Sequence, residues 1–404
     1  MNSDLVAVLD LGSTKVTCLA ASADGPNGMS IEGLSTTPCR GMRRGQVADL
    51  AEVSRAIEEV VRKVEIEVDE DIESLVVGIS GSHIEGICSQ GYKPIVPPGR
   101  KLTHQDVLEV INHSRAVTIS SDREQIQSLP REFRVDGQRN VHKPVGMPGS
   151  KLEVLTYIAT GQSTSLQNIE QALTGAGKKV EQMVIQSLAS GVGILTPEEM
   201  ELGAAVIDIG GSTTDFAIFQ HGSIAFCATI PVGGLAVTND LSQLLKTSPE
   251  EAERLKLEFG CALAKLVEER DSVEVIQLGQ PVARPMQRRV LCEIIQSRMR
   301  EIASMVAKQI ESSEFGGVLQ GGLVLTGGGS ALNGTAQLFE ETTKKYKVRT
   351  AEPTLGPKFP KQVGMATAVG LASFTIQCFD ELSPAEGVLP WRDRVKSLFS
   401  MLSR

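Results

Sequence analysis

The sequence predicts an α/β protein made of two similar halves, on two observations. First, residues 7–19 and 205–218 share one pattern: an apolar run, Asp-x-Gly, a hydroxyl-rich turn and a second apolar run. Each copy is typical of a β-hairpin whose first strand is buried on both faces. Second, helical spacing and further buried strands follow each copy. A repeat at this distance indicates two α/β domains related by duplication.

Helical and strand-like patterns follow the first hairpin in turn. Asp49–Val64 carries apolar residues at helical spacing, and Ser74–Ile79 has the pattern of a buried strand. Residues 82–160 change character, because they hold proline-containing turns between several short β-like runs. This change predicts a small inserted domain. A helix over 163–176, then a strand and a second helix within 180–195, return to the earlier pattern.

The second hairpin is followed by longer helices. Ser248–Phe259 begins with Ser-Pro-Glu-Glu, a strong helix start, and Arg288–Glu311 predicts a long helix. Leu323–Gly329 predicts a strand that runs into a glycine loop. Residues 361–379 include the longest uncharged run, which Gly, Ala, Ser, Thr and Gln dilute. We therefore expect a buried, closely packed helix there rather than a membrane span.

Composition and charge exclude several classes of protein. The 404 residues are 41% apolar and 22% charged, which excludes a disordered chain, a collagen-like chain and a polytopic membrane protein. A net charge of −9 argues against nucleic-acid binding, because phosphates need an excess of Lys and Arg. Seven scattered cysteines without a CxxC pair predict neither a disulfide framework nor a zinc site, and they fit a reducing cytoplasm.

The turns of both hairpins offer what a phosphate tail needs: backbone N–H donors, a cation, and carboxylates that hold a metal. Gly12 lets the backbone approach closely, and Lys15 can place its ammonium on a phosphate. One such turn is a weak indication, because Asp-x-Gly turns are common in plain hairpins, but two copies flanked by buried strands are much stronger. The candidate residues are Asp10, Gly12, Ser13, Thr14 and Lys15 in the first turn, and Asp208, Gly210, Gly211, Ser212, Thr213 and Asp215 in the second.

Three further patterns have both a functional and a structural interpretation. Gly327–Gly329 follows a buried strand and could receive an adenine or ribose, or make a tight connection to a helix. Glu253 and Lys256 lie three apart on one helix face, where they could bracket a ribose or form a solvated charged face. Gln186, at the end of an apolar strand, could orient an attacking water or make a capping or interdomain hydrogen bond.

The terminal segment 391–404, which follows a linker at 384–390, has an amphipathic helical pattern. Its apolar face consists of Trp391, Val395, Leu398, Phe399 and Leu402. Basic residues outnumber acids there, which suits a helix lying in an anionic membrane surface; the alternative is a helix docked on its own domain or on a partner. One short helix binds weakly, so anchoring needs several copies, which polymerisation supplies.

The order of these motifs resembles the actin/Hsp70/sugar-kinase superfamily, and within it the FtsA family of bacterial cell-division proteins. The superfamily motifs are the two hairpins, the Gln after a strand, the Glu-x-x-Lys helix and the Gly-Gly-Gly loop. The family-level residues are Ser80–Ile84, Glu132–Gln138, Gly146-Met147, Lys151–Glu153 and the basic amphipathic terminus. The resemblance covers nearly the whole chain. It implies an actin-like (ribonuclease H-like) duplicated fold with an FtsA-type inserted subdomain and a C-terminal amphipathic helix.

The resemblance also implies ATP with Mg²⁺ in a cleft between two actin-like halves. Asp10 and Asp208 would lie near the metal, and Lys15 would touch phosphate. Gln186 and Asp215 would be catalytic, near the hydrolytic water, although hydrolysis is expected to be weak at most. The ribose would be held by Glu253 and Lys256, and the adenosine by Gly327, Gly328 and Gly329.

A division into subdomains follows from the same resemblance. The expected parts are subdomain 1A at 1–81, 162–196 and 353–383, an SHS2-like subdomain 1C at 82–161, subdomain 2A at 197–236 and 309–352, subdomain 2B at 237–308, the linker at 384–390 and the membrane-targeting helix at 391–404.

The expected function is that of an ATP-binding filament former at the cytoplasmic face of the cell membrane, at the division septum. It would tether the FtsZ ring through its terminal helix and recruit later division proteins. A basic patch on an acidic protein can bind an acidic peptide, and Arg284 and Arg298 are the candidate contacts for the FtsZ C-terminal tail, against a solvated helix face. The alternatives are an FtsA-like pilus-assembly protein, or a sugar kinase or chaperone ATPase of the same fold.

Overall fold

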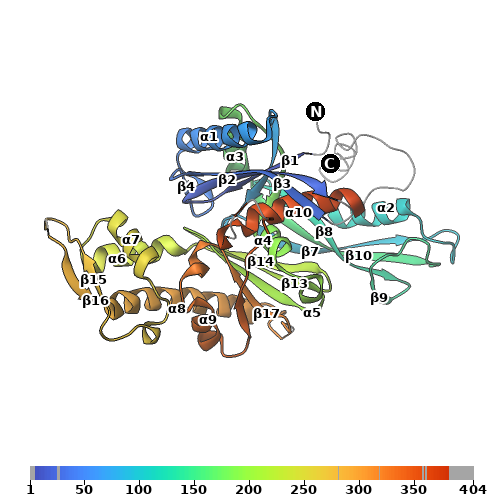
Figure 1. Cartoon of the computed structure of the whole chain (residues 1–404). Coiled ribbons are helices and arrows are strands. Elements are labelled where there is room, and N and C mark those ends of the chain that lie inside the picture. Colours follow the sequence, from blue (N-terminus) through green and yellow to red (C-terminus); the bar gives the residue numbers. More distant parts are fainter. Residues whose placement is uncertain are drawn as a thin grey trace.

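The computed structural model describes residues 5–24, 28–280, 282–317, 319–356, 359 and 362–381. The predicted linker and terminal helix at 384–404 lie outside these residues. Figure 1 shows two sheets one above the other, with helices α4 (Gln186–Ile194) and α10 (Ala366–Glu381) between them. No helix in the described part of the chain is long and apolar enough to cross a membrane.

The first sheet has the order β11-β6-β1-β2-β3. Its strands are β1 (Val6–Leu11), β2 (Lys15–Asp24), β3 (Gly28–Pro38), β6 (Ser74–Ile79) and β11 (Lys179–Ile185). β1 is antiparallel to β2 and parallel to β6. The continuous apolar run of β1 is explained by this central position, where both faces are covered.

The second sheet repeats the first strand for strand, in the order β14-β13-β12-β17-β18. Its strands are β12 (Ala204–Ile209), β13 (Thr214–Gln220), β14 (Ser223–Ile230), β17 (Gly322–Thr326) and β18 (Val348–Thr350). β12 is antiparallel to β13 and parallel to β17, just as β1 is to β2 and β6. The predicted duplicated α/β fold is therefore confirmed.

Helices α1 (Leu50–Val68) and α3 (Ser163–Gly175) pack together beside the first sheet and share one apolar core with it. The Asp49 side chain caps α1 by accepting a hydrogen bond from the Glu52 N–H. α1 continues past its predicted end at Val64, and in this added turn Glu65 pairs with Lys178 at 2.7 Å. A small hairpin, β4 (Met42–Arg43) with β5 (Gln46–Val47), precedes α1.

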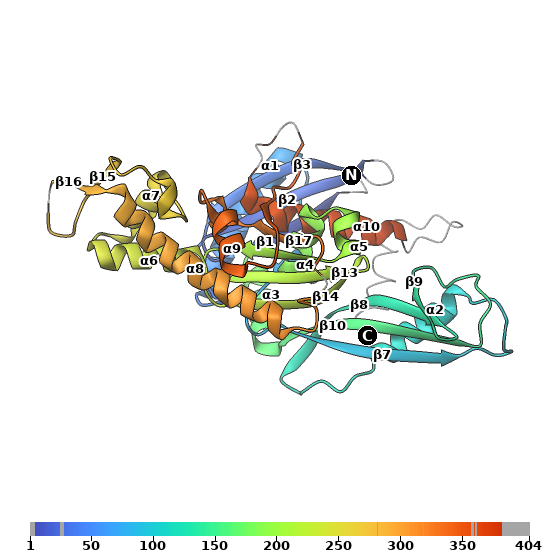
Figure 2. The ribbon, with the colours of Figure 1, turned by 90° about the horizontal axis from the view of Figure 1, so that it is seen from below.

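The segment between β14 and β17 forms an arm that extends away from the second sheet (Figure 2). It contains α6 (Gly234–Leu245), α7 (Pro249–Phe259), the 3-10 turn η1 (Ala264–Leu266), the hairpin β15 (Ser272–Val275) and β16 (Arg284–Gln287), and α8 (Arg288–Ser312). α7 begins as predicted, because Ser248 caps it and Pro249 stands at its first position. α9 (Thr335–Thr343) packs on α8 beside the sheet.

The predicted insert is a separate four-stranded sheet of order β7-β10-β8-β9 with helix α2 (His104–Arg115). Its strands are β7 (Glu85–Pro94), β8 (Arg123–Val135), β9 (Gln138–Val141) and β10 (Lys151–Gln162). Three of them are long, whereas the sequence predicts short runs. The reason is local: the register of β8 on β10 shifts beside Pro130, so one long strand has an interrupted apolar pattern. The proline-containing segments at 94–99 and 143–149 are the loops at the ends of these strands.

One apolar core joins the two sheets through α4 and α10. It contains Val8 and Leu19 from the first sheet, Val206 and Phe219 from the second, and Leu371 from α10. The predicted packed helix at 361–379 is confirmed in its buried character, but the helix α10 begins at Ala366, after the 3-10 turn η3 (Val363–Met365). α5 (Pro197–Leu202) links α4 to the second sheet.

Candidate functional site

The turns of the two predicted hairpins meet between the halves of the molecule. Each turn closes in the same way: the Gly12 N–H donates to Lys15 O at 3.1 Å, and the Gly210 N–H donates to Thr213 O at 2.9 Å. The hydroxyls of Ser13 and Ser212 hydrogen-bond each other across the gap. A Cβ on Gly211 would lie 2.6 Å from Thr14 Cγ2, so the close approach needs a glycine at 211. The duplication therefore brings its two copies together at one place.

Asp10, at the end of β1, is held by Gln186. The Gln186 side-chain Nε2 donates to Asp10 Oδ1 at 2.7 Å and also lies 3.3 Å from Gly78 O. Gln186 is the first residue of α4 and directly follows β11, as the sequence predicts. Burial raises the pKa of Asp10 to about 7, the Asp208 carboxylate adds to this, and Lys15 opposes it. The charge of Lys15 therefore compensates the Asp10 carboxylate only in part.

Asp208, the equivalent residue of β12, is held by two hydroxyls. Ser190 Oγ donates to Asp208 Oδ2 at 2.6 Å, and Thr367 Oγ1 donates to the same oxygen at 3.1 Å. The other oxygen, Oδ1, lies beside Gly327, where a Cβ would approach it to 2.1 Å. Burial raises the pKa of Asp208, and the two hydroxyls oppose this rise.

Asp215, on β13, pairs directly with Asp208 in the sheet. Thr213 Oγ1 donates to Asp215 Oδ2 at 3.0 Å, and Thr229 on β14 donates to Oδ1. Burial raises the pKa of Asp215 to about 6, with the Thr229 hydroxyl opposing the rise and Asp208 adding to it. Three carboxylates with raised pKa values therefore gather at the meeting point of the hairpins.

Lys15 supplies the cation at this point. Its Nζ donates to Gly364 O at 3.3 Å, in the turn before α10. A Cβ on Gly364 would lie 3.4 Å from Lys15 Nζ and 3.8 Å from Gly328 N, so Lys15 also lies beside the predicted glycine loop. The first hairpin and the glycine loop are thus brought together by η3.

The glycine loop has one open and two crowded positions. Gly327 has φ +80° and leaves room for the Asp208 carboxylate, and a Cβ on Gly329 would lie 2.4 Å from Ile209 Cγ2. Nothing lies within 4 Å of the place where a Cβ on Gly328 would stand. The loop packs tightly on the second hairpin and keeps an open backbone surface at Gly328.

Glu253 and Lys256 on α7 pair with each other, Nζ to Oε2, at 2.7 Å. Glu253 also accepts a hydrogen bond from the Thr238 hydroxyl, and Lys256 Nζ lies 3.2 Å from Gly234 O. Gly234 N–H in turn donates to Gly210 O at 2.9 Å. The structural interpretation of a solvated face is wrong for Lys256, which is buried and is linked to the second hairpin through Gly234 of α6.

The described residues contain no group of three His, Cys, Asp or Glu side chains that could hold a metal ion by themselves. Such a group is not required for Mg²⁺ with a nucleotide, because this ion takes one or two carboxylates and completes its shell with phosphates and water. The carboxylates of Asp10 and Asp208, which are partly buried and both have raised pKa values, fit that donor set.

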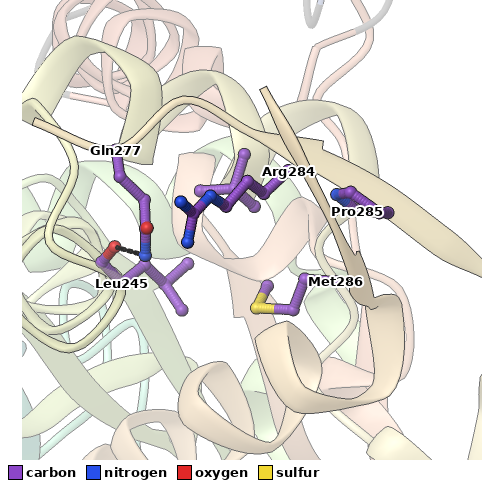
Figure 3. A pocket seen from close by; sticks show the side chains of 6 residues that line it. Leu245, Gln277, Arg284, Pro285 and Met286 are labelled. Atoms are coloured by element: carbon purple, nitrogen blue, oxygen red, sulfur yellow. Dashed lines mark hydrogen bonds between the residues drawn. The ribbon is translucent and has the colours of Figure 1, made fainter. Parts of the chain in front are cut away.

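The predicted peptide contacts, Arg284 and Arg298, lie in different surroundings. Arg284 lines a pocket of about 240 Å³ with Leu245, Val275, Gln277 and Met286, and its side chain extends across the pocket toward Gln277 (Figure 3). Arg298 is outside this lining. Its guanidinium makes two hydrogen bonds to Asp240, at 2.7 and 2.9 Å, and a third to Glu301.

Comparison with known proteins gives the family. The family model "Cell division protein FtsA" matches residues 205–370, and the model "SHS2 domain inserted in FTSA" matches residues 81–160, where the sequence predicts the insert. The chain is 33% identical to cell division protein FtsA of Neisseria meningitidis serogroup B, over 99% of this chain and 97% of that protein. The chain belongs to the FtsA family. The resemblance stated from the motifs is thereby confirmed.

Solved structures of low identity confirm the actin-like fold of this FtsA-family chain. The structure titled "PilM-PilN type IV pilus biogenesis complex" superimposes with a TM-score of 0.62 at 16% identity, covering 92% of this chain and 98% of that one. MreB5 of Spiroplasma citri, a structure bound to ADP, gives 0.56 at 13% identity, covering 94% and 99%. These likenesses show the fold alone. Family membership favours cell division over the alternatives of pilus assembly, sugar kinase or chaperone ATPase.

Sequence reasoning about this FtsA-family site missed the groups that hold the carboxylates. Ser190 and Thr367 stand in helices of mostly small and apolar residues that hold other hydroxyls as well, so the sequence does not show which hydroxyl makes a polar contact. They lie 177 positions apart and meet only because α4 and α10 pack together. Thr229 was missed for the same reason, since nothing in the sequence of β14 indicates that Thr229 pairs with Asp215 on β13. Gly364 could have been noticed as a glycine just before a helix.

Proposed function

We propose that this FtsA-family chain binds ATP with Mg²⁺ between its two hairpins and assembles on the cytoplasmic face of the cell membrane. There it tethers the FtsZ ring at the septum and helps to recruit later division proteins. The observation that carries the nucleotide part is the meeting of two duplicated turns, one cation and a glycine loop at three carboxylates, of which Asp215 is buried and Asp10 and Asp208 are partly buried. Neither half of the molecule holds this set alone, so a ligand there bridges both halves.

The residues of the site have distinct proposed roles. Lys15 and the backbone of both turns bind phosphate, and Asp10 and Asp208 face the magnesium ion with their carboxylates. Mg²⁺, when bound, neutralises phosphate charge and orients the phosphate chain. The open backbone at Gly328 supports the adenosine, while Glu253 offers its partly exposed carboxylate to the ribose and remains oriented by Lys256.

Gln186 and Asp215 are the proposed residues near the hydrolytic water. Both are already engaged, Gln186 with Asp10 and Asp215 with the hydroxyls of Thr213 and Thr229. Gln186 is an amide and can only orient a water, and both oxygens of Asp215 already accept hydrogen bonds, so neither is a strong base for activating water. This arrangement supports a nucleotide used for assembly, with weak hydrolysis at most.

The membrane and FtsZ parts rest on other regions. The five apolar residues of the terminal segment and its basic residues suit an interfacial helix. For the acidic FtsZ tail, the pocket at Arg284 supports a contact, because its cation is exposed and its lining is partly apolar. Arg298 is the weaker candidate, since two acidic side chains already compensate its charge.

Sedimentation with vesicles tests the membrane part. The full chain and a chain ending at Glu386 are mixed with phosphatidylglycerol vesicles or with neutral phosphatidylcholine vesicles, each with and without Mg-ATP. We expect only the full chain to pellet, only with anionic vesicles, and more strongly with Mg-ATP because polymers bind through many helices. Equal pelleting of both chains, or no pelleting of either, contradicts the anchor. A Lys15→Ala chain serves as the matched control, since it keeps the helix and should lose only the effect of ATP.

A further inference from the structure

The two oxygens of the Asp208 carboxylate have different surroundings. Oδ2 accepts hydrogen bonds from Ser190 and Thr367, whose hydroxyls also lie 3.0 Å from each other. Oδ1 lies on the side of Gly327, at the start of the glycine loop. Two donors on one oxygen fix the rotation of the carboxylate, because any turn about the Cβ–Cγ bond breaks both bonds.

The two hydroxyls come from helices that occupy equivalent places in the duplicated halves. α4 follows β11, the edge strand of the first sheet, and α10 follows β18, the edge strand of the second. The helices cross at glycines: a Cβ on Gly370 would lie 1.7 Å from Ala189 O, and one on Gly193 would lie 2.5 Å from Ala366 O. Ser190 and Thr367 each stand beside this crossing, and both are buried.

We propose that Ser190 and Thr367 are positioning residues, which hold the Asp208 carboxylate in the one orientation in which it would serve the magnesium ion of a bound nucleotide. The inference rests on the proposed nucleotide site and goes beyond it, because it assigns a role to two residues that lie outside every nucleotide motif of the sequence. The pair is also a contact between the halves: a carboxylate of the second sheet is held by hydroxyls of the two helices that lie between the sheets.

Asp10 shows why these hydroxyls matter to Asp208 in particular. Asp10 is held by one amide, through one oxygen, from the first residue of a single helix. Asp208 is held from two helices, so its orientation depends on how α4 and α10 pack. A change in that packing therefore alters the orientation of the Asp208 carboxylate.

The test compares ATP affinity with Mg²⁺ and with EDTA, by calorimetry on the full chain. The variants are Ser190→Ala and Thr367→Val, with Thr367→Ser as the conservative variant that restores the hydroxyl. We expect Mg-ATP affinity to fall about tenfold in each of the first two, as for a lost hydrogen bond to a charged group, and metal-free affinity to change less than about twofold. Thr367→Ser should recover Mg-ATP affinity.

Thr375→Val is the matched control, because Thr375 is a buried threonine of α10 whose hydroxyl donates to Leu371 O at 2.7 Å. It should leave both affinities unchanged. Melting temperatures without nucleotide show that each variant is folded, and Thr367→Val carries the test if Ser190→Ala fails to fold. Equal losses with and without Mg²⁺, or a loss in Thr375→Val as large as in Thr367→Val, overturn the positioning role. Absence of ATP binding by the unaltered chain overturns the proposed function instead.

Discussion

The first and second hairpins have the same backbone and different charges. In both, four residues separate the last paired residues, which are Leu11 and Val16 in the first hairpin and Ile209 and Thr214 in the second. Gly12 therefore corresponds to Gly210 and Asp10 to Asp208. By the same register Lys15 corresponds to Thr213, and Thr17, which pairs with Asp10, corresponds to Asp215, which pairs with Asp208. The first hairpin therefore carries the cation, and the second carries an additional carboxylate.

This difference indicates how duplication can produce one asymmetric site. Two identical turns would present either two cations or two pairs of carboxylates to a ligand held between them. A nucleoside triphosphate with a metal, the ligand proposed above, carries anionic phosphate oxygens beside a cation, so it would fit one turn of each kind. In the proposed site, the backbone of both turns would be the shared part, and Lys15 and Asp215 would give the two turns different roles.

The largest effect should come from the place where the glycine loop meets the second hairpin. In Gly327→Ala, a Cβ would stand 2.1 Å from Asp208 Oδ1 at a φ of +80°, so we expect the free energy of unfolding to fall by about 3 kcal/mol. Urea unfolding measures it. Gly328→Ala is the control, because nothing lies within 4 Å of the added atom. Similar losses in both variants would show that the loop packs differently.

Alanine substitutions at the corresponding positions 15 and 213 test whether the two hairpins contribute differently to phosphate binding. Lys15→Ala should lower ATP affinity about 100-fold, because it removes the positive charge beside the phosphates. Thr213→Ala removes only a hydroxyl that donates to Asp215, and the expected loss is about threefold. Calorimetry with Mg-ATP measures both. Equal losses in the two variants would mean that the hairpins share the phosphates evenly.

The pH dependence of stability tests the carboxylates without nucleotide. The pKa of Asp10 is raised from 3.8 to about 7, so the folded state holds a proton that the unfolded state has released. Stability should therefore fall as pH rises through this range, by about 1.4 kcal/mol per pH unit for one proton. Asp10→Asn should flatten the slope between about pH 6 and 7 most, because Asp215 titrates lower, at about 6. An unchanged slope would contradict the raised pKa of Asp10.

The smallest effect concerns Thr17, the counterpart of Asp215. Its hydroxyl is fully buried and has no hydrogen-bond partner among the described residues. Thr17→Val keeps the shape and removes the unpaired oxygen, so we expect a gain of about 1 kcal/mol in the free energy of unfolding. Thr229→Val is the contrasting variant, since that hydroxyl is bound to Asp215, and it should lose stability. Thermal unfolding of both variants decides the sign.

The sequence predicts the fold and the turns of the site because both depend on local patterns. The repeat, the capped start at Ser248 and the alternation of helix and strand are visible within short windows. What holds each carboxylate depends on distant contacts, and no short window contains them. Thr367 reaches Asp208 across 159 positions, and Gln186 reaches Asp10 across 176.

The two arginines predicted to bind a peptide show that surface contacts are also hard to predict from the sequence. Arg284 and Arg298 are equally basic in the sequence, but the packing of α6 on α8 gives Arg298 a carboxylate partner in Asp240. The interrupted pattern of β8 is a further case, because the shift beside Pro130 makes one long strand resemble two short ones. In both cases the sequence gives the residue types, but not the contacts that these residues make in the fold.

A structure of the full chain crystallised with Mg²⁺ and a non-hydrolysable ATP analogue is the most direct test of the nucleotide site. It should show the phosphates between the two turns, with Lys15 on phosphate, Asp10 and Asp208 on the metal side and the adenosine at the Gly328 backbone. A nucleotide bound to one hairpin alone, or elsewhere in the molecule, would contradict a site shared by the duplicated halves.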